Sequence, residues 1–178
     1  YINMDEFTAF DKIYHQNYQG DLSDLMYYFK QNKDTVAIKL KAIVNTVNTL
    51  DYVPPLKYSR DLRTMETTKW IELLETIMAT GMYENIVIDI GDGIRMPWNM
   101  MDCCDEIYIC ETGNYIENMR FKNFEKYLLE QGLDNIAATF KKIHVNEDEN
   151  INNDDIWGRL PFCSFYEELC RTAGIEEI

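Results

Sequence analysis

The sequence predicts an α/β fold, with a parallel sheet flanked by helices. Short apolar runs rich in β-branched residues alternate with segments of helical periodicity, and this alternation is typical of βαβ units. Three of the runs are almost continuously apolar: 1–4, 86–90 and 107–110. Continuous apolarity indicates strands buried on both faces, as in a parallel sheet. We therefore expect these three runs to be parallel neighbours or near-neighbours in one sheet.

Apolar spacing and chain breakers mark the elements of the first half. Residues 20–24 form a helix start, and the apolar residues beyond it recur at helical spacing: Leu22, Leu25, Met26 and Phe29. Residues 35–50 fit strand alternation and a helix face equally. Residues 50–53 predict a short strand, which Pro54 and Pro55 end because proline lacks the N–H that a ladder needs.

The clearest helix is predicted over residues 66–80, where apolar side chains follow an i, i+3, i+4, i+7, i+8 pattern. These side chains are Trp70, Leu73, Leu74, Ile77 and Met78. Gly81 suits the C-terminal cap, because glycine adopts the left-handed conformation without strain. The strand over 86–90 then ends at the turn Gly91-Asp92-Gly93.

The second half repeats the alternation of strands and helices. The strand over 107–110 precedes a helix over 116–131, which has one apolar side: Met119, Phe121, Phe124 and Leu128. The acidic, Asn-rich run 146–155 predicts a solvated loop. Further short elements are expected at 137–140 (helix), 143–145 (strand), 160–162 (strand) and 164–172 (helix).

The length of the chain limits the number of domains, and its charge limits the classes of partner. The 178 residues fit one α/β domain. With 31 acidic against 17 basic residues, the formal net charge is −14. This charge disfavours binding to nucleic acid or to an anionic membrane surface, since both rely on clustered Lys and Arg. No apolar run approaches the roughly 20 residues that span a bilayer, so membrane insertion is not expected.

The five cysteines are odd in number and irregular in spacing: Cys103, Cys104, Cys110, Cys163 and Cys170. No CxxC pair or histidine at metal-ligand spacing accompanies them. We expect reduced, mostly buried thiols in a cytoplasmic protein. A catalytic pairing of one cysteine with His15 or His144 is the alternative.

Acidic residues mark the ends of two predicted strands. Asp5 follows the run 1–4, and Asp89 lies within the run 86–90. Open α/β sheets bind ligands at the carboxyl ends of their strands, where a carboxylate can hold Mg²⁺ beside a phosphate. The glycines of the turn at 91–93 would let backbone N–H groups approach an anion. In the alternative interpretation, Asp89 only caps a following helix and the glycines only permit a tight turn.

These segments resemble the MinD/ParA family of P-loop ATPases. Residues 83–93 look like the family's Walker B and switch II segment, in which an apolar strand is followed by Asp and a short turn ending in Gly. Residues 1–5 are similar to its second strand, which usually ends Asp-x-Asp; here these positions are Asn3 and Asp5. Residues 22–25 and 107–110 also fit, and the resemblance covers most of residues 1–125.

Within that family, the TadZ/CpaE branch, which positions pilus-assembly machinery, is the most similar. Residues 50–55 followed by 59–62 resemble an insertion of that branch with two prolines and then an acidic residue before Leu. Residues 158–162 resemble its closing segment. The resemblance therefore implies a Rossmann-like sheet of the P-loop NTPase type.

The resemblance also implies the roles of the site residues. Asp89 would bind Mg²⁺ through water, and Gly91 and Gly93 would meet the phosphates of ATP, with the Gly93 N–H on the terminal phosphate. Asp5 would face the attacking water or the switch I side of the metal. Phosphoryl transfer relies on such charge neutralisation and water placement more than on covalent chemistry.

The chain departs from the family in two ways. No GxxxxGK[ST] phosphate loop occurs in the 178 residues. We therefore expect an N-terminally incomplete, C-terminal portion of a P-loop ATPase-like domain, or a pseudo-ATPase. Asn3 in place of the first Asp weakens the case for efficient hydrolysis.

Three hypotheses follow. The first is a cytoplasmic, ATP-binding positioning factor that works as a dimer with a protein partner, an ATPase only if an upstream phosphate loop exists. The second is an interaction domain that kept the fold and lost the nucleotide, with the apolar residues of 96–101 as a docking surface or as helix core. The third is a receiver-like or flavodoxin-like domain, in which Asp5-Glu6 and Asp89 imitate an acidic pair and a phosphorylatable Asp.

Overall fold

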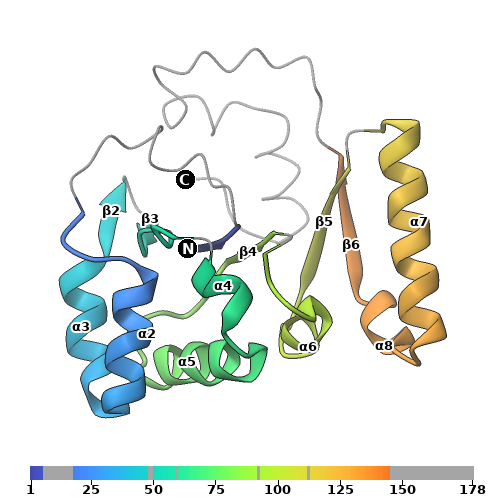
Figure 1. Ribbon diagram of the computed structural model, residues 1–178. Coiled ribbons are helices and arrows are strands. Elements are labelled where there is room, and N and C mark those ends of the chain that lie inside the picture. Colours follow the sequence, from blue (N-terminus) through green and yellow to red (C-terminus); the bar gives the residue numbers. More distant parts are fainter. Residues whose placement is uncertain (6–17, 48–49, 59, 92, 112, 145–178) are drawn as a thin grey trace. The chain divides into compact units, whose positions relative to one another are not determined.

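The computed structural model describes residues 1–5, 18–47, 50–58, 60–91, 93–111 and 113–144. Within it the chain forms two compact units, Tyr1–Cys103 and Cys104–Ile178 (Figure 1). The elements expected at 146–155, 160–162 and 164–172 lie outside the described residues. The expectation that residues 1–178 form a single domain stays a prediction.

The first unit contains a parallel strand pair. β1 (Ile2–Met4) pairs in parallel with β4 (Ile88–Ile90), as the apolar runs predict. β2 (Asn45–Val47) and β3 (Leu50–Tyr52) form an antiparallel pair. A parallel bridge between Ile2 and Val53 continues β3 alongside β1. β1 thus has a neighbour on each side.

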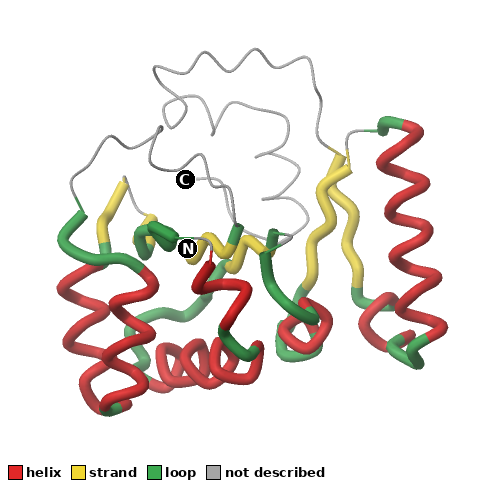
Figure 2. Tube along the Cα trace, viewed as in Figure 1, coloured by secondary structure: helices red, strands yellow, loops and turns green. Residues whose placement is uncertain are grey.

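The helices of the first unit pack against these strands through apolar faces, and Figure 2 shows them below the strands in that view. They are α2 (Leu22–Gln31), α3 (Val36–Ile43), α4 (Arg60–Thr64), α5 (Thr67–Ala79) and α6 (Pro97–Met101), with a 3₁₀ turn, η1 (Lys33–Thr35), between α2 and α3. The core holds Ile2 and Met4 from β1 together with residues of all five α-helices.

The predicted helices of this unit are confirmed. α2 starts at a capping box in which the Asp21 carboxylate accepts from the backbone of Ser23 and Asp24, and its four predicted apolar residues are all buried. α5 buries Trp70, Leu73 and Ile77, and the Gly81 that follows it has φ +65°. The expected C-terminal cap is therefore present.

β4 differs from its prediction. Val87 is 59% exposed and Asp89 is exposed, whereas Ile86, Ile88 and Ile90 pack against the core. Side chains alternate between the two faces of a strand, so only one face of β4 is buried in the described structure. The prediction that the run 86–90 is buried on both faces is therefore wrong. The same prediction is confirmed for β1, whose residues are all buried.

The second unit contains a βαβ arrangement. β5 (Ile107–Glu111) pairs in parallel with β6 (Phe140–His144), and α7 (Tyr115–Glu130) and α8 (Asp134–Ala137) lie between them in sequence. The Phe124 ring stacks on Phe140 at 6.1 Å between centroids. Leu128 is buried but Met119 is exposed, so the predicted apolar side of α7 is only partly covered. That β5 joins the same sheet as β1 and β4 stays a prediction.

The apolar residues at 96–101 differ in their burial. Met100 is buried in the core, Trp98 and Met101 are half-buried, and Met96 is exposed. The segment is therefore partly helix core and partly surface. Among the described residues, no helix combines the length and apolarity needed to cross a membrane.

Candidate functional site at the carboxyl edge of β1 and β4

The parallel register brings the acidic ends of β1 and β4 to one edge. Asn3 lies opposite Asp89 and Met4 opposite Ile90, so Asp5 and Gly91 follow side by side. A Cβ placed on Gly91 would lie 2.6 Å from the Asp5 Oδ1 atom and 2.8 Å from its Cα. Asp5 and Asp89 therefore lie near the same end of the pair, as predicted for parallel strands. The roles that the resemblance implies for them stay predictions.

Neutral donors hold one oxygen of Asp89. Its Oδ2 accepts hydrogen bonds from the Tyr1 hydroxyl at 2.7 Å and from Asn3 Nδ2 at 3.1 Å. Within the described residues, Oδ1 has no hydrogen-bond partner and no basic side chain pairs with the carboxylate. The exposed Asp89 side chain thus offers one anchored oxygen and one that can meet a ligand.

Asn3 connects the two acidic residues. Its side chain is buried, at 6% exposed, although Asp89 opposite it is exposed. Nδ2 donates to Asp89 and lies 3.2 Å from the Tyr1 hydroxyl oxygen, while Oδ1 accepts the backbone N–H of Asp5 at 3.1 Å. These partners fix the amide orientation, because the reverse orientation would place its oxygen against a carboxylate and its NH₂ against an N–H donor.

Tyr1 stays a neutral donor near neutral pH. Burial raises the pKa of its hydroxyl well above the ordinary range, the hydrogen bond with Asn3 lowers it, and the hydrogen bond and charge of Asp89 raise it. The charge of Asp5 adds to the rise in pKa. Both donors on Asp89, the Tyr1 hydroxyl and the Asn3 amide, are therefore uncharged.

The two glycines of the following turn differ in their surroundings. Gly91 is required by space rather than by backbone conformation, since any side chain there would collide with Asp5. Gly93 is buried in the turn before α6. Their expected contacts with phosphates stay predictions.

Metal sites with several protein ligands, and nucleophile sites, find little support. Among the described residues, which include Asp5 and Asp89, no group of three or more His, Cys, Asp or Glu side chains is placed to hold a metal ion. Burial and the charges of Asp102 and Glu75 raise the pKa of the Cys103 thiol. A thiol with a raised pKa is a poor nucleophile at neutral pH, so nothing supports the cysteine–histidine alternative at this residue. Cys103 and Cys110 are exposed and Cys104 is half-buried, so the expectation of mostly buried thiols is wrong for the cysteines that the structure describes.

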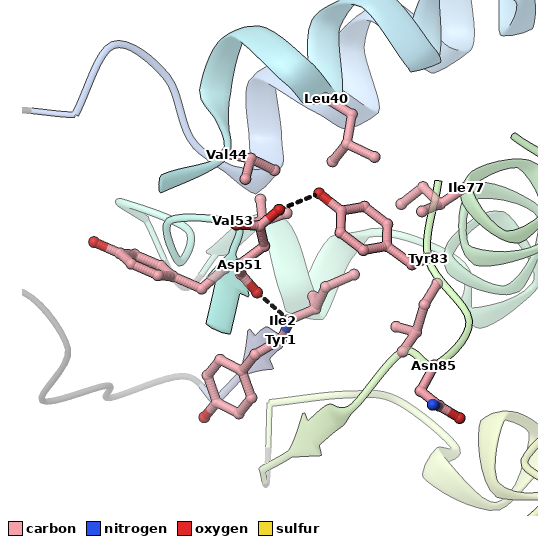
Figure 3. Close-up of a pocket in the computed structure, with 11 residues that line it drawn as sticks. Tyr1, Ile2, Leu40, Val44, Asp51, Val53, Ile77, Tyr83 and Asn85 are labelled. Carbon is pink, nitrogen blue, oxygen red and sulfur yellow. Dashed lines mark hydrogen bonds between the residues drawn. The ribbon is translucent and has the colours of Figure 1, made fainter. Parts of the chain in front are cut away.

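A small pocket lies between β1, β3 and helices α3 and α5 (Figure 3), lined among others by Leu40, Val44 and Ile77. Asp51 accepts a hydrogen bond from Tyr83 there at 2.9 Å, and its carbonyl accepts from the Tyr1 nitrogen at 2.7 Å. The cavity volume is about 30 Å³, close to the share of one water molecule in the liquid. It cannot hold a nucleotide.

A larger hollow of about 220 Å³ lies where α5 begins. Arg63, Arg95 and Glu66 are among its lining residues, and the Thr67 hydroxyl there donates to the Arg95 carbonyl oxygen. Its two cationic side chains distinguish it from the acidic edge of β1 and β4. This hollow is the alternative location for a bound ligand, so a binding experiment must distinguish it from the edge of β1 and β4.

The hydrogen bonds of Tyr1 and Asn3 with Asp89 were not predicted from the sequence. In the sequence, Asn3 stands out only as a departure from the family's acidic pattern, and Tyr1 only as part of a strand. The signal lay in the register: once β1 and β4 are aligned as parallel neighbours, Asn3 faces Asp89. Local sequence does not contain that alignment.

Comparison with protein-family models, with curated proteins and with solved structures gave no match for this chain.

Proposed function

We propose that this chain is the carboxylate-bearing part of an ATP-binding protein of the MinD/ParA type, a positioning or assembly factor for pilus or secretion machinery. The observation that carries the proposal is the parallel pairing of β1 with β4, which puts Asp5, just after β1, and Asp89, in β4, near the same end of the pair, the carboxyl edge. Open α/β sheets bind ligands at this edge. Carboxylates placed there serve to hold Mg²⁺ beside phosphate.

The residues present fit a magnesium ion that also binds phosphate. Mg²⁺ takes one or two carboxylates from a protein and keeps water and phosphate oxygens as its other ligands, and when bound it neutralises charge on the phosphates. Asp89 would hold it through water, using the oxygen that Tyr1 and Asn3 leave free of contact. Asp5 would place the attacking water, and the N–H groups of Gly91 and Gly93 would meet the phosphates.

The phosphate-binding half of such a site is not among the 178 residues, because they contain no GxxxxGK[ST]. Tight ATP binding therefore requires a Gly-rich loop from outside this sequence. With such a loop the protein would be an ATPase; without one it would bind ATP weakly or not at all.

A role in positioning follows by elimination among the functions of that family. The net charge of −14 opposes DNA binding. Residues 167–178 contain four Glu and one Arg, unlike a basic amphipathic membrane helix. A protein partner, with the chain acting as a cytoplasmic homodimer, is the remaining choice.

A second candidate is an interaction domain that kept the fold and lost the nucleotide. Asn3 favours it, because a buried, fully hydrogen-bonded amide stands where the family pattern has an acid. The exposed Met96, next to the buried Met100, would belong to its docking surface.

Calorimetry with Mg²⁺ and ATP tests the proposal, using protein that includes any sequence naturally preceding Tyr1. Asp89→Asn should weaken Mg²⁺-dependent binding about tenfold or more, since a charge-assisted contact contributes about 1.5–3 kcal/mol. Asp5→Ala should spare binding and slow hydrolysis. Asp34→Asn, which neutralises an exposed carboxylate in η1, is the control. Equal binding by the parent and Asp89→Asn would refute the metal role.

A further inference from the structure

One side chain, Asn3, contacts both acidic residues of the proposed site. Its Nδ2 donates to the carboxylate of Asp89 on β4, and its Oδ1 accepts the backbone N–H of Asp5 at the end of β1. It is buried, whereas Asp89 is exposed. A buried amide with both of its polar atoms engaged has a defined orientation. It can therefore hold the two acidic residues in one arrangement.

The neutral charge of Asn3 matters to Asp89. A carboxylate at position 3 would bring a second negative oxygen to about the 3.1 Å that now separates Nδ2 from Asp89 Oδ2. Two carboxylates at this separation repel each other, whereas the amide of Asn3 donates a hydrogen bond to the Asp89 carboxylate. The residue that departs from the family pattern is thus the one that can anchor Asp89 Oδ2 in this structure.

We propose that Asn3 is the positioning residue of the site: it anchors Oδ2 of Asp89, with Tyr1 as second donor, so that Oδ1 is left to a hydrated divalent cation. Asn3 also ties the Asp5 backbone to the same amide. The role toward the cation rests on the proposed function, whereas the double link itself does not. Residues that orient a metal-binding carboxylate through hydrogen bonds typically change metal affinity when they are substituted.

Two substitutions separate the two links. Asn3→Asp keeps an oxygen acceptor for the Asp5 N–H but replaces the donor to Asp89 with a negative charge. Asn3→Ala removes both links. The double variant Asn3→Asp with Asp89→Asn again places an amide donor opposite a carboxylate acceptor. The amide is now at position 89 and the carboxylate at position 3. It should therefore recover the structure of the pair without recovering the cation site.

Two measurements on protein with any sequence naturally preceding Tyr1 test the proposal. The first is the amide chemical shift of Asp5 without ligand, which should change in Asn3→Ala and remain near that of the parent in Asn3→Asp. The second is calorimetry with Mg²⁺ and ATP. Asn3→Asp should weaken Mg²⁺-dependent affinity by about 10–100-fold, and the double variant should recover the parent's urea midpoint but not its affinity.

The outcomes distinguish this inference from the proposed function. Parent-like affinity in Asn3→Asp, or full recovery of affinity in the double variant, would overturn the positioning role while nucleotide binding stands. A parent protein that binds no Mg²⁺–ATP would overturn the proposed function and the cation role together. In that case the Asp5 shift and the urea midpoints still decide whether Asn3 links the two strand ends. An unchanged Asp5 shift in Asn3→Ala would show that it does not.

Discussion

Asn3 Nδ2 lies 3.1 Å from Asp89 Oδ2, across a parallel strand pair that joins residues 86 positions apart in the sequence. The contact brings an amide and a carboxylate together on the face of the pair turned away from the helix-packed core residues of β4. The Tyr1 hydroxyl adds a second neutral donor to the same oxygen. Two neutral donors thus hold one oxygen of the Asp89 carboxylate.

Gly91 and Gly81 should respond differently to substitution. Gly91→Ala places a methyl group against the Asp5 backbone, and overpacking of this kind costs about 1–3 kcal/mol of the free energy of unfolding. Gly81 has φ +65° and open space around it, so Gly81→Ala should cost roughly 1–2 kcal/mol through backbone strain alone.

Substitution with asparagine distinguishes the collision at position 91 from the backbone strain at position 81. Because Asn adopts the left-handed conformation more readily than Ala, Gly81→Asn should be more stable than Gly81→Ala in urea unfolding. Gly91→Asn should be no better than Gly91→Ala, because the collision with Asp5 remains. A rescue by Asn at position 91 would contradict the packing at the site.

Tyr83 makes the free energy of unfolding of the first unit vary with pH in the alkaline range. Burial, followed by the hydrogen bond and charge of Asp51, raises its pKa to about 12 from the ordinary value of 10.0. The unfolded chain therefore loses this proton at lower pH than the folded chain, and the contribution of Tyr83 to stability falls as pH rises from 10.0 to about 12.

Unfolding of Tyr83→Phe across that pH interval checks the prediction. The variant should lose stability less steeply with pH than the parent, although other tyrosines with raised pKa values keep part of the slope. Asp51→Asn should lower the pKa of Tyr83 by removing the carboxylate's charge. An unchanged slope in Tyr83→Phe would show that the Asp51–Tyr83 contact does not persist in solution.

The start of α2 depends on Asp21. Its carboxylate accepts from the backbone N–H groups of Ser23, Asp24 and Lys57. Asp21→Ala should reduce the free energy of unfolding by about 1 kcal/mol, typical of a lost N-cap. Asp34→Ala is the matched control, because the cap of η1 is supplied by Asn32 instead. Equal effects of the two substitutions would contradict the capping role.

The 178 residues by themselves should bind Mg²⁺–ATP weakly or not at all. The carboxylates are present but the phosphate loop is not, and a carboxylate site alone does not attract a polyphosphate anion. Calorimetry of this chain should give dissociation constants well above about 1 μM. Submicromolar binding would show that the chain holds a phosphate site that neither sequence motif nor structure has identified.

Helices of the first unit could be predicted because their signals are local. In α2 and α5, apolar spacing coincides with a start or stop residue, and both helices are found. Residues 35–50 were ambiguous because Ile38 completes a strand-like alternation. In the structure Val36, Leu40 and Ile43 are buried on one side of α3, and Ile38 is 70% exposed on the other.

Burial of β4 and the partners of Asp89 could not be predicted, because both depend on neighbours distant in sequence. Apolarity of a strand does not reveal how many strands or helices will cover it, and Val87 is exposed. The common edge of Asp5 and Asp89 followed from the behaviour of parallel strands. The contact of Asn3 with Asp89 required the register as well.

Paramagnetic broadening by Mn²⁺ is the most direct test of the proposed site, because Mn²⁺ accepts the same oxygen ligands as Mg²⁺. Protein with any sequence naturally preceding Tyr1 would be labelled with ¹⁵N and mixed with a non-hydrolysable ATP analogue. The account predicts that Mn²⁺ broadens the amide signals of Asp5, Asp89 and Gly91 first, and that Asp89→Asn abolishes this effect. Broadening centred on Arg63 and Arg95, or unchanged broadening in Asp89→Asn, would contradict it.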